Sequence, residues 1–412
     1  MGEPWVPPRR AVAARVSAAL PLALSDALRD WLDLGLRWLH VVAAMAWIGT
    51  SFYFVLLDQS LRPAQDPADR DAGVGGELWE VHGGGFYHVQ KYVVAPPRLP
   101  DHLAWFKWEA YTTWLSGFGL MLVLYYLEAS SALVKPGSDL DPWLAVVISI
   151  ALLAVAWIAY DVLNRLVSDG RVLWPILFAL VALAAWGSSE LFAPRAAWLQ
   201  LGAMIGTVMA ANVFAVIIPA HWELIRAKEA GREPDPAPAL QAKQRSVHNN
   251  YLTLPVLLTM LAGHFPFAYG ADNAWLVLVV LMLIGGWARL FFNLRHAGRT
   301  HWWMPVAGLA AFVAIAVVVD RSGDSAAPAA TPAAVARGKQ VFLSAGCAGC
   351  HTLADAGATG TVGPSLDASQ PPASLVAARV REGKGVMPSF AGSLDDAEIA
   401  AVAAYVSAAA AG

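Results

Sequence analysis

The sequence predicts an all-α membrane protein, in which a bundle of about eight helices precedes a small all-α domain at the C-terminus. Three observations predict this fold. The 412-residue chain is 57% hydrophobic and only 14% charged, whereas soluble proteins average about 45–50% and about 25%. Long apolar runs recur up to residue 320, and a more polar, helix-patterned segment follows them. A formal net charge of -3 without a dense basic stripe excludes a nucleic-acid partner.

Residues 1–30 contain Pro and Arg, only a weak apolar stretch and no clear cleavage site, so we expect a retained N-terminal tail. The expected membrane domain covers 31–320. Its apolar runs are long enough to cross a hydrocarbon core, which takes about 20 residues. The eight runs cover 34–57, 108–127, 143–164, 172–190, 196–219, 250–269, 274–294 and 302–319. The fourth and fifth are so close that they form either two spans or one hairpin with a tight external turn.

After Asp320 the sequence changes to RSGDSAAPAATPAA, which is too small and polar to form a core. We therefore expect 321–332 to be a flexible linker and 333–412 to be a separate domain. The only two cysteines, Cys347 and Cys350, are followed at once by His351. This spacing is that of covalent c-type haem attachment, with His351 as an axial ligand. The C-terminal domain is therefore predicted to be a cytochrome c domain.

Met387 is the only methionine after the haem motif and is the expected second axial ligand of the haem iron. Pro388 would stiffen the loop that presents it. Gly363 and Pro364 begin a turn whose proline carbonyl is expected to accept the N–H of His351, although an ordinary turn would look the same.

Haem c is attached outside the cytoplasm, so the cytochrome domain predicts a multi-pass protein of the bacterial inner membrane with this domain in the periplasm. An even number of spans then places four loops in the cytoplasm. The positive-inside rule agrees, because these loops hold 14 Lys and Arg, against two in the three loops opposite. The loops are 58–107, 162–171, 220–249 and 295–301. Four arginines in the N-terminal tail disagree with this topology.

His40 and His264 lie near the external ends of the first and sixth runs. Two imidazoles at similar depth could ligate a haem b, or each could simply bond to a neighbouring helix. Both interpretations stay open at this point.

The loop 58–107 is rich in residues that suit a binding site. Gly83 to Gly85 would let backbone approach a ligand closely, unless the segment only covers the helix ends. Its donors and titratable groups are His82, Tyr87, His88, Gln90 and Lys91. Two further sets of polar residues are expected on the same side of the membrane, either as part of a site or as topology anchors. They are Arg245, His248, Asn249 and Asn250 before the sixth span, and Arg289, Asn293 and His296 on one helical face.

Four segments resemble the membrane-bound, cytochrome c-fused urate oxidase (urate hydroxylase) family of bacteria. They are ELWEVHGGGFYHVQKY, FKWEAYTTWLSGF, WLHVVAAMAWIGTSFYFVLLDQSL and HNNYLTLPVLLTMLAGHFPFAYG. The resemblance implies oxidation of urate to 5-hydroxyisourate in purine catabolism. It also implies that the electrons leave through haem c to the respiratory chain, by a soluble cytochrome c or a terminal oxidase.

Urate is a flat anionic purine, so its site needs cations or N–H donors and a general base. Our hypothesis assigns His82 or His88 as the base and Lys91 and Arg245 as anion partners. Gln90, Tyr87 and Asn249 are the expected substrate-binding groups. Two other classes of function fit many of the same features: a non-catalytic relay from quinol to the cytochrome, and a purine transporter with a redox domain.

Overall fold

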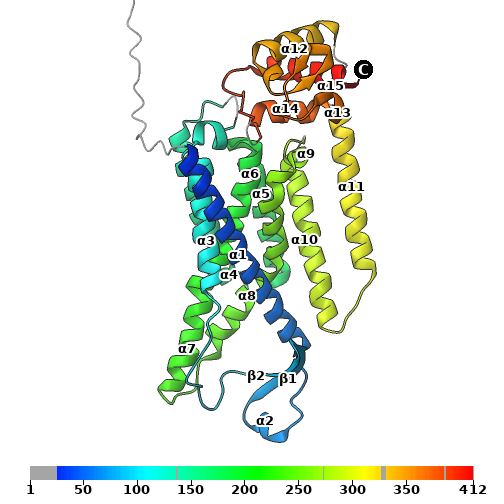
Figure 1. Ribbon diagram of the computed structural model, residues 1–412. Coiled ribbons are helices and arrows are strands. Elements are labelled where there is room, and N and C mark those ends of the chain that lie inside the picture. The colour runs from blue at the N-terminus through cyan, green and yellow to red at the C-terminus, as the bar shows by residue number, and fades with distance from the viewer. Residues whose placement is uncertain (1–25, 136–137, 272, 326–330, 385–386, 412) are drawn as a thin grey trace, which may run out of the picture.

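The computed structural model describes residues 26–135, 138–271, 273–325, 331–384 and 387–411. Within these ranges the chain forms a bundle of long helices with a small helical domain at one end (Figure 1). The predicted all-α fold class is therefore confirmed. The expected tail falls mostly outside the described residues, and the first helix, α1, begins at Asp26.

The bundle helices begin and end close to most of the expected apolar runs. They are α1 (Asp26–Ser60), α3 (Trp108–Met121), α4 (Pro142–Leu166), α5 (Gly170–Leu191), α6 (Pro194–Asn212), α7 (Ile218–Glu229), α8 (Pro236–Leu261), α9 (Pro266–Tyr269), α10 (Ala274–His296) and α11 (Trp303–Ser325). Among the described residues, six helices are long and apolar enough to cross a membrane. They are Ala27–Ser60, Pro142–Leu166, Gly170–Leu191, Pro194–Glu229, Ala274–His296 and Trp303–Asp320.

The other two expected spans form helices with different bounds. The run 108–127 becomes α3 followed by a π-helical turn, Leu122–Tyr126. The run 250–269 was wrong at both ends, because α8 already begins at Pro236 and stops at Leu261. The polar residues 241–250 looked like loop, yet they continue the helix because their side chains bond to neighbouring helices. Both α3 and α8 pack within the bundle, α3 against α1 and α8 against α6 and α10.

The segment expected as a long loop folds into a short helix, α2 (Pro67–Asp71), and an antiparallel hairpin of β1 (Val74–His82) and β2 (Gly85–Tyr92). Gly83 and Gly84 form its two-residue turn with φ of 58° and 83°. Such a turn requires positive φ at both positions, which glycine adopts at little cost. The glycine run is therefore explained by the turn and needs no ligand.

The C-terminal domain contains α12 (Pro332–Ser344), α13 (Leu366–Ser369), α14 (Ala373–Glu382) and α15 (Asp396–Ala411). A two-stranded pairing of β3 (Thr352–Leu353) with β4 (Ala358–Thr359) follows the cysteine motif. Phe342 of α12 and Tyr405 of α15 are almost fully buried where these helices pack, with ring centroids 5.8 Å apart. α11 continues to Ser325, so residues 321–325 of the expected linker are helical, whereas residues 326–330 lie outside the described part of the chain.

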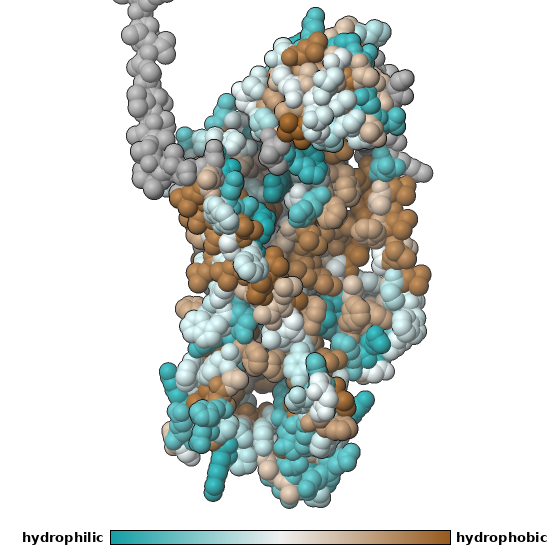
Figure 2. All heavy atoms as spheres, viewed as in Figure 1, coloured by the Kyte–Doolittle hydropathy of each residue, from teal (hydrophilic) through white to brown (hydrophobic). Residues whose placement is uncertain are grey.

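The two ends of the bundle differ. The cytochrome domain covers one end, which we call the cytochrome end, and the hairpin lies at the other, which we call the hairpin end (Figure 1). The turn between α10 and α11 also lies at the hairpin end. Figure 2 shows apolar side chains along the middle of the molecule and more hydrophilic ones at both ends. This is the distribution expected of helices that cross a lipid bilayer.

Candidate functional site

The cysteine motif is built to hold a haem. Cys347 begins a short 3-10 turn, Cys350 ends it, and His351 follows. The Nδ1–H of His351 donates to the carbonyl of Pro364 at 2.9 Å, which confirms the expected bond and leaves Nε2 free for iron. A Cβ on Gly363 would lie 2.5 Å from the His351 ring, so only glycine allows this approach. These residues fit a covalently attached haem c.

Met387 lies in the loop before α15 and packs against the core of the cytochrome domain. Its backbone N–H and carbonyl both bond to Lys384, at 3.0 Å each, which fixes the start of this loop. Its role as the second ligand of the haem iron stays a prediction.

In the described part of the chain, a partly buried side-chain hydrogen bond joins the cytochrome domain to the bundle. The hydroxyl of Tyr269 in α9 donates to Oε2 of Glu382 in α14 at 2.8 Å. Burial raises the pKa of the Glu382 carboxyl, although the Tyr269 bond and the nearby Arg195 act in the opposite direction. Docking therefore favours the protonated carboxyl.

We expect the contact between the two domains to tighten at low pH. Docking should be fully favoured below the ordinary pKa of glutamate, near 4.5, and weaken as the pH rises through the raised pKa of Glu382. Hydrogen exchange of the α14 amides, corrected for the intrinsic pH effect, measures this. Glu382→Gln keeps an acceptor for Tyr269 and should be independent of pH. An unchanged pH profile in this variant would contradict the assignment to Glu382.

The structure gives no support to a haem b between His40 and His264. Nδ1 of His40 lies 2.9 Å from the carbonyl oxygen of Thr113, and the ring rests against Gly117 of α3. His264 lies exposed beyond the end of α8. The partner helix of His40 is therefore α3.

The hairpin holds its own polar side chains. Nε2 of His88 lies 2.9 Å from Oε2 of Glu77, and the His88 ring stacks on Trp79 at 4.2 Å. A backbone hydrogen bond from Gln65 and the His88 bond lower the pKa of Glu77. His88 and Glu77 are therefore each other's partners within the hairpin, and neither needs a ligand to complete the pair.

Among the described residues, no hydrogen bond or ion pair joins the remaining hairpin candidates to Arg245 or Asn249. Gln90 donates to Asp69 of α2 at 2.7 Å, whereas His82 and Tyr87 are exposed. Lys91 pairs with Asp58 of α1, which also pairs with Lys243 of α8 at 3.1 Å. Through these two ion pairs, the Asp58 carboxylate links the hairpin to the N-terminal part of α8.

A buried polar layer crosses the bundle in its hairpin half. One part, the paired cluster, consists of Tyr160, Asp161, Asn212, Arg245, His248 and Asn249. Arg245 donates to Asp161 at 2.8 Å and lies over the Tyr160 ring at 4.9 Å. Asn212 links the Tyr160 hydroxyl, at 3.2 Å, to Oδ1 of Asn249, at 2.9 Å. The charge on Arg245 is therefore compensated by a carboxylate.

The second part, the unpaired cluster, consists of Asn250, Arg289, Asn293 and His296. Oδ1 of Asn250 accepts from Nε of Arg289 at 2.9 Å and from Nδ2 of Asn293 at 3.0 Å. Each of the four side chains also has a buried nitrogen or oxygen without a hydrogen-bond partner. The sequence hypothesis had not chosen these residues, although the shared face of Arg289, Asn293 and His296 was visible in their spacing.

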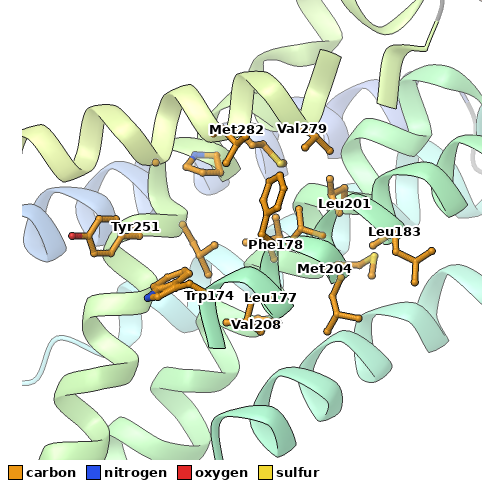
Figure 3. Close-up of a pocket in the computed structure, with 18 of the residues that line it drawn as sticks. Trp174, Leu177, Phe178, Leu183, Leu201, Met204, Val208, Tyr251, Val279 and Met282 are labelled. Atoms are coloured by element: carbon orange, nitrogen blue, oxygen red, sulfur yellow. The ribbon is translucent and has the colours of Figure 1, made fainter. Parts of the chain in front are cut away.

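A large cavity lies beside the paired cluster, along α5 (Figure 3). Its volume is about 1340 Å³, and apolar residues such as Phe178, Leu201 and Met204 form most of its wall. His248 and Tyr251 are among its few polar lining residues, and no Asp, Glu, Lys or Arg lines it. The cavity therefore suits an apolar occupant and offers no cation to an anion.

Comparisons with known proteins divide the chain at the linker. The family model described as "Urate oxidase N-terminal" matches residues 26–320. The model described as "Cytochrome C oxidase, cbb3-type, subunit III" matches residues 333–406.

Individual relatives match only the cytochrome domain. The cytochrome c6 of Tetradesmus obliquus is 42% identical over 84 residues, which are 18% of this chain and 86% of that protein. The cytochrome c6 of a Picosynechococcus species is 40% identical over 86 residues, covering 17% of this chain and 69% of that protein. Among solved structures, the c-type cytochrome SorU from Sinorhizobium meliloti is 47% identical, covers 19% of this chain and 94% of that one, and gives a TM-score of 0.19.

Proposed function

Because the chain belongs to the urate oxidase N-terminal family and ends in a cytochrome c domain, we propose that it oxidises urate to 5-hydroxyisourate and passes the electrons to its own c-type haem. The observation that carries this proposal is the joining of the two domains in one chain. The coarser statement, an oxidoreductase with haem-based electron transfer, follows directly from the two matches.

The reaction sets clear demands on the protein. The urate anion and one water give 5-hydroxyisourate, one proton and two electrons. When bound, haem c supplies a carrier for one electron at a time. The polypeptide must hold a flat anion, accept a proton and admit water. A polar layer inside the bundle can do this, because buried polar groups in membrane helices are costly and are usually kept for function.

The proposed orientation is that of a multi-pass protein in the bacterial inner membrane, with the cytochrome end in the periplasm. Lys and Arg in the segments at the hairpin end support it. Urate would then enter from the cytoplasm, and the electrons would leave on the other side to a soluble cytochrome c or a terminal oxidase. The sequence hypothesis of His88, Lys91 and Arg245 at the substrate needs these residues to leave their present partners.

Membranes that contain the protein should convert urate to 5-hydroxyisourate, detected by its ultraviolet absorbance, while an added cytochrome c is reduced. Two reduced cytochromes per product molecule are expected, with little hydrogen peroxide. Membranes without the protein are the control. Accumulation of unchanged urate inside vesicles would favour a transporter, and reduction of cytochrome by quinol alone would favour a relay. Either result without urate consumption would contradict the proposal.

A further inference from the structure

We infer that the unpaired cluster of Asn250, Arg289, Asn293 and His296 is the site that binds the planar anionic purine; this rests on the proposed function. The first reason is the charge of Arg289. Arg289 is only 4% exposed, and no ion pair among the described residues includes it. Buried charges in proteins are normally paired. A negatively charged ligand would supply the missing partner of Arg289.

Arg245 and Arg289 differ in the partners of their guanidinium groups. Both arginines are almost fully buried in neighbouring helices of the same layer. Arg245 has Asp161 at 2.8 Å, whereas Arg289 has the uncharged Asn250 at 2.9 Å and the ring of Phe52, whose centroid lies 3.8 Å from Cζ. An amide and an aromatic ring leave the positive charge without a formal counter-charge. Arg289 is therefore the better anion partner.

The second reason is that all four side chains of the cluster leave buried polar atoms without hydrogen-bond partners. They are Nη2 of Arg289, Nδ2 of Asn250, Oδ1 of Asn293 and Nδ1 of His296. Oδ1 of Asn250 accepts two hydrogen bonds, which fixes its amide so that Nδ2 remains a donor. The Asn293 amide donates through Nδ2, which leaves Oδ1 as an acceptor. The cluster thus offers two donors, one acceptor and one imidazole nitrogen.

This set of groups matches a urate anion. Urate carries ring carbonyls and N–H groups side by side on a flat frame, together with a negative charge. The guanidinium and the Asn250 amide can donate to carbonyl oxygens, while Oδ1 of Asn293 accepts a ring N–H. A neutral aliphatic ligand or a phospholipid tail would leave all of these polar atoms unpaired, which is unfavourable.

His296 is the general base in this proposal. It follows Arg289 by seven residues and Asn293 by three on α10, so the three side chains share one helical face. As a neutral imidazole, His296 can accept the proton that leaves a ring N–H when the electron pair is removed. Two electrons would pass one at a time through the bound haem c to its external acceptor, and one proton would go to His296. Water then adds across the oxidised ring, with its OH on carbon and its hydrogen on a ring nitrogen, so no second proton is released. Atoms and charge balance in this sequence.

The hairpin and this site both contact the same part of α1. Phe52, which touches Arg289, precedes Tyr53, whose hydroxyl donates to Glu80 of β1 at 2.6 Å. The two residues are consecutive on α1, so the cluster lies close to the point where the hairpin is anchored. The hairpin thus lies on the side of the bundle from which urate is proposed to enter.

The test is the binding of radiolabelled urate to the purified, haem-loaded full chain in lipid nanodiscs, by equilibrium dialysis. Arg289→Gln should weaken binding about a hundredfold, because it removes a buried charged donor. Arg289→Lys keeps the charge but loses the planar fork and should weaken binding about tenfold. Arg299→Gln, an exposed position beyond α10, is the matched control and should bind normally. Size-exclusion profiles show whether each variant is folded.

His296→Gln tests the base separately. It should leave urate affinity within about twofold but lower kcat about a hundredfold, since general bases contribute roughly 10²–10⁴ in rate. Wild-type affinity in folded Arg289→Gln would overturn the assignment of this site while leaving the proposed function intact. Wild-type protein that binds urate without oxidising it would contradict the proposed function while leaving the binding site intact.

Discussion

Replacing both Cys347 and Cys350 with alanine should abolish electron delivery from urate to an added acceptor. Covalent attachment needs both thiols, and the domain then lacks its electron carrier. Haem staining of a denaturing gel should show no band at the position of the protein, and urate-dependent reduction of cytochrome c should fall to the level of empty membranes. The proposed purine site lies in the bundle, so radiolabelled urate should still bind with wild-type affinity.

This retained binding separates a lost carrier from a misfolded protein. His351→Ala leaves both thiols in place and removes only the axial nitrogen, so haem should stay attached with an altered spectrum while electron delivery falls sharply. Wild-type rates of urate-dependent acceptor reduction in the double variant would show that electrons bypass the cytochrome domain.

Replacing Arg245 with alanine should destabilise the protein by about 1–3 kcal/mol, because it removes the buried partner of Asp161 and leaves this carboxylate only the exposed Arg165. The Tyr160 ring also loses the guanidinium that lies over it. The temperature at which the detergent-solubilised protein loses its monodisperse size-exclusion peak should drop accordingly.

The matched control removes both charges. Arg245→Met combined with Asp161→Leu should recover most of the lost stability, since it leaves no unpaired buried charge. Lys228→Ala, which breaks an ion pair with the exposed Glu233, should change stability little. Normal stability with selective loss of urate binding in Arg245→Ala would instead favour the role that the sequence hypothesis gave this residue.

The features that the sequence predicted best are those with a short-range signature. Apolar runs follow directly from the cost of burying polar groups in lipid, so most helix positions were recognisable. The motif of Cys347, Cys350 and His351 is equally local, and the cytochrome family model matches the domain that contains it.

The start of α8 and the hairpin could not be predicted from local sequence patterns. Residues 241–250 are polar, and hydropathy alone assigns them to a loop. They are helical because Arg245, Asn249 and Asn250 bond to three different helices, which is a tertiary effect. In the hairpin, the glycine run fitted a ligand-binding loop as well as a tight turn until the strand pairing was known.

The choice between the two arginines depended on their partners. In the sequence, Arg245 and Arg289 are both basic residues near the ends of apolar runs. Only the fold shows that Asp161 lies beside the first and that no described carboxylate pairs with the second. Spacing placed Arg289, Asn293 and His296 on one face, but it could not show that their polar atoms lack partners.

The position of the polar layer makes electron transfer the most demanding step. Thirteen residues of α8 separate His248 from Leu261 at the cytochrome end. At 1.5 Å per residue this is about 20 Å along the bundle. The proposed sites of urate oxidation and haem reduction therefore lie at well-separated levels, and a direct measurement has to link them.

The most direct measurement is the anaerobic addition of urate to the purified, fully oxidised protein while the absorbance of the c-type haem is recorded. Our account predicts that the haem becomes reduced within the turnover time, with two haems reduced for each 5-hydroxyisourate formed. The Arg289→Gln variant should show the same final amplitude only at much higher urate concentration. A haem that stays oxidised at saturating urate, although dithionite reduces it, would contradict the account.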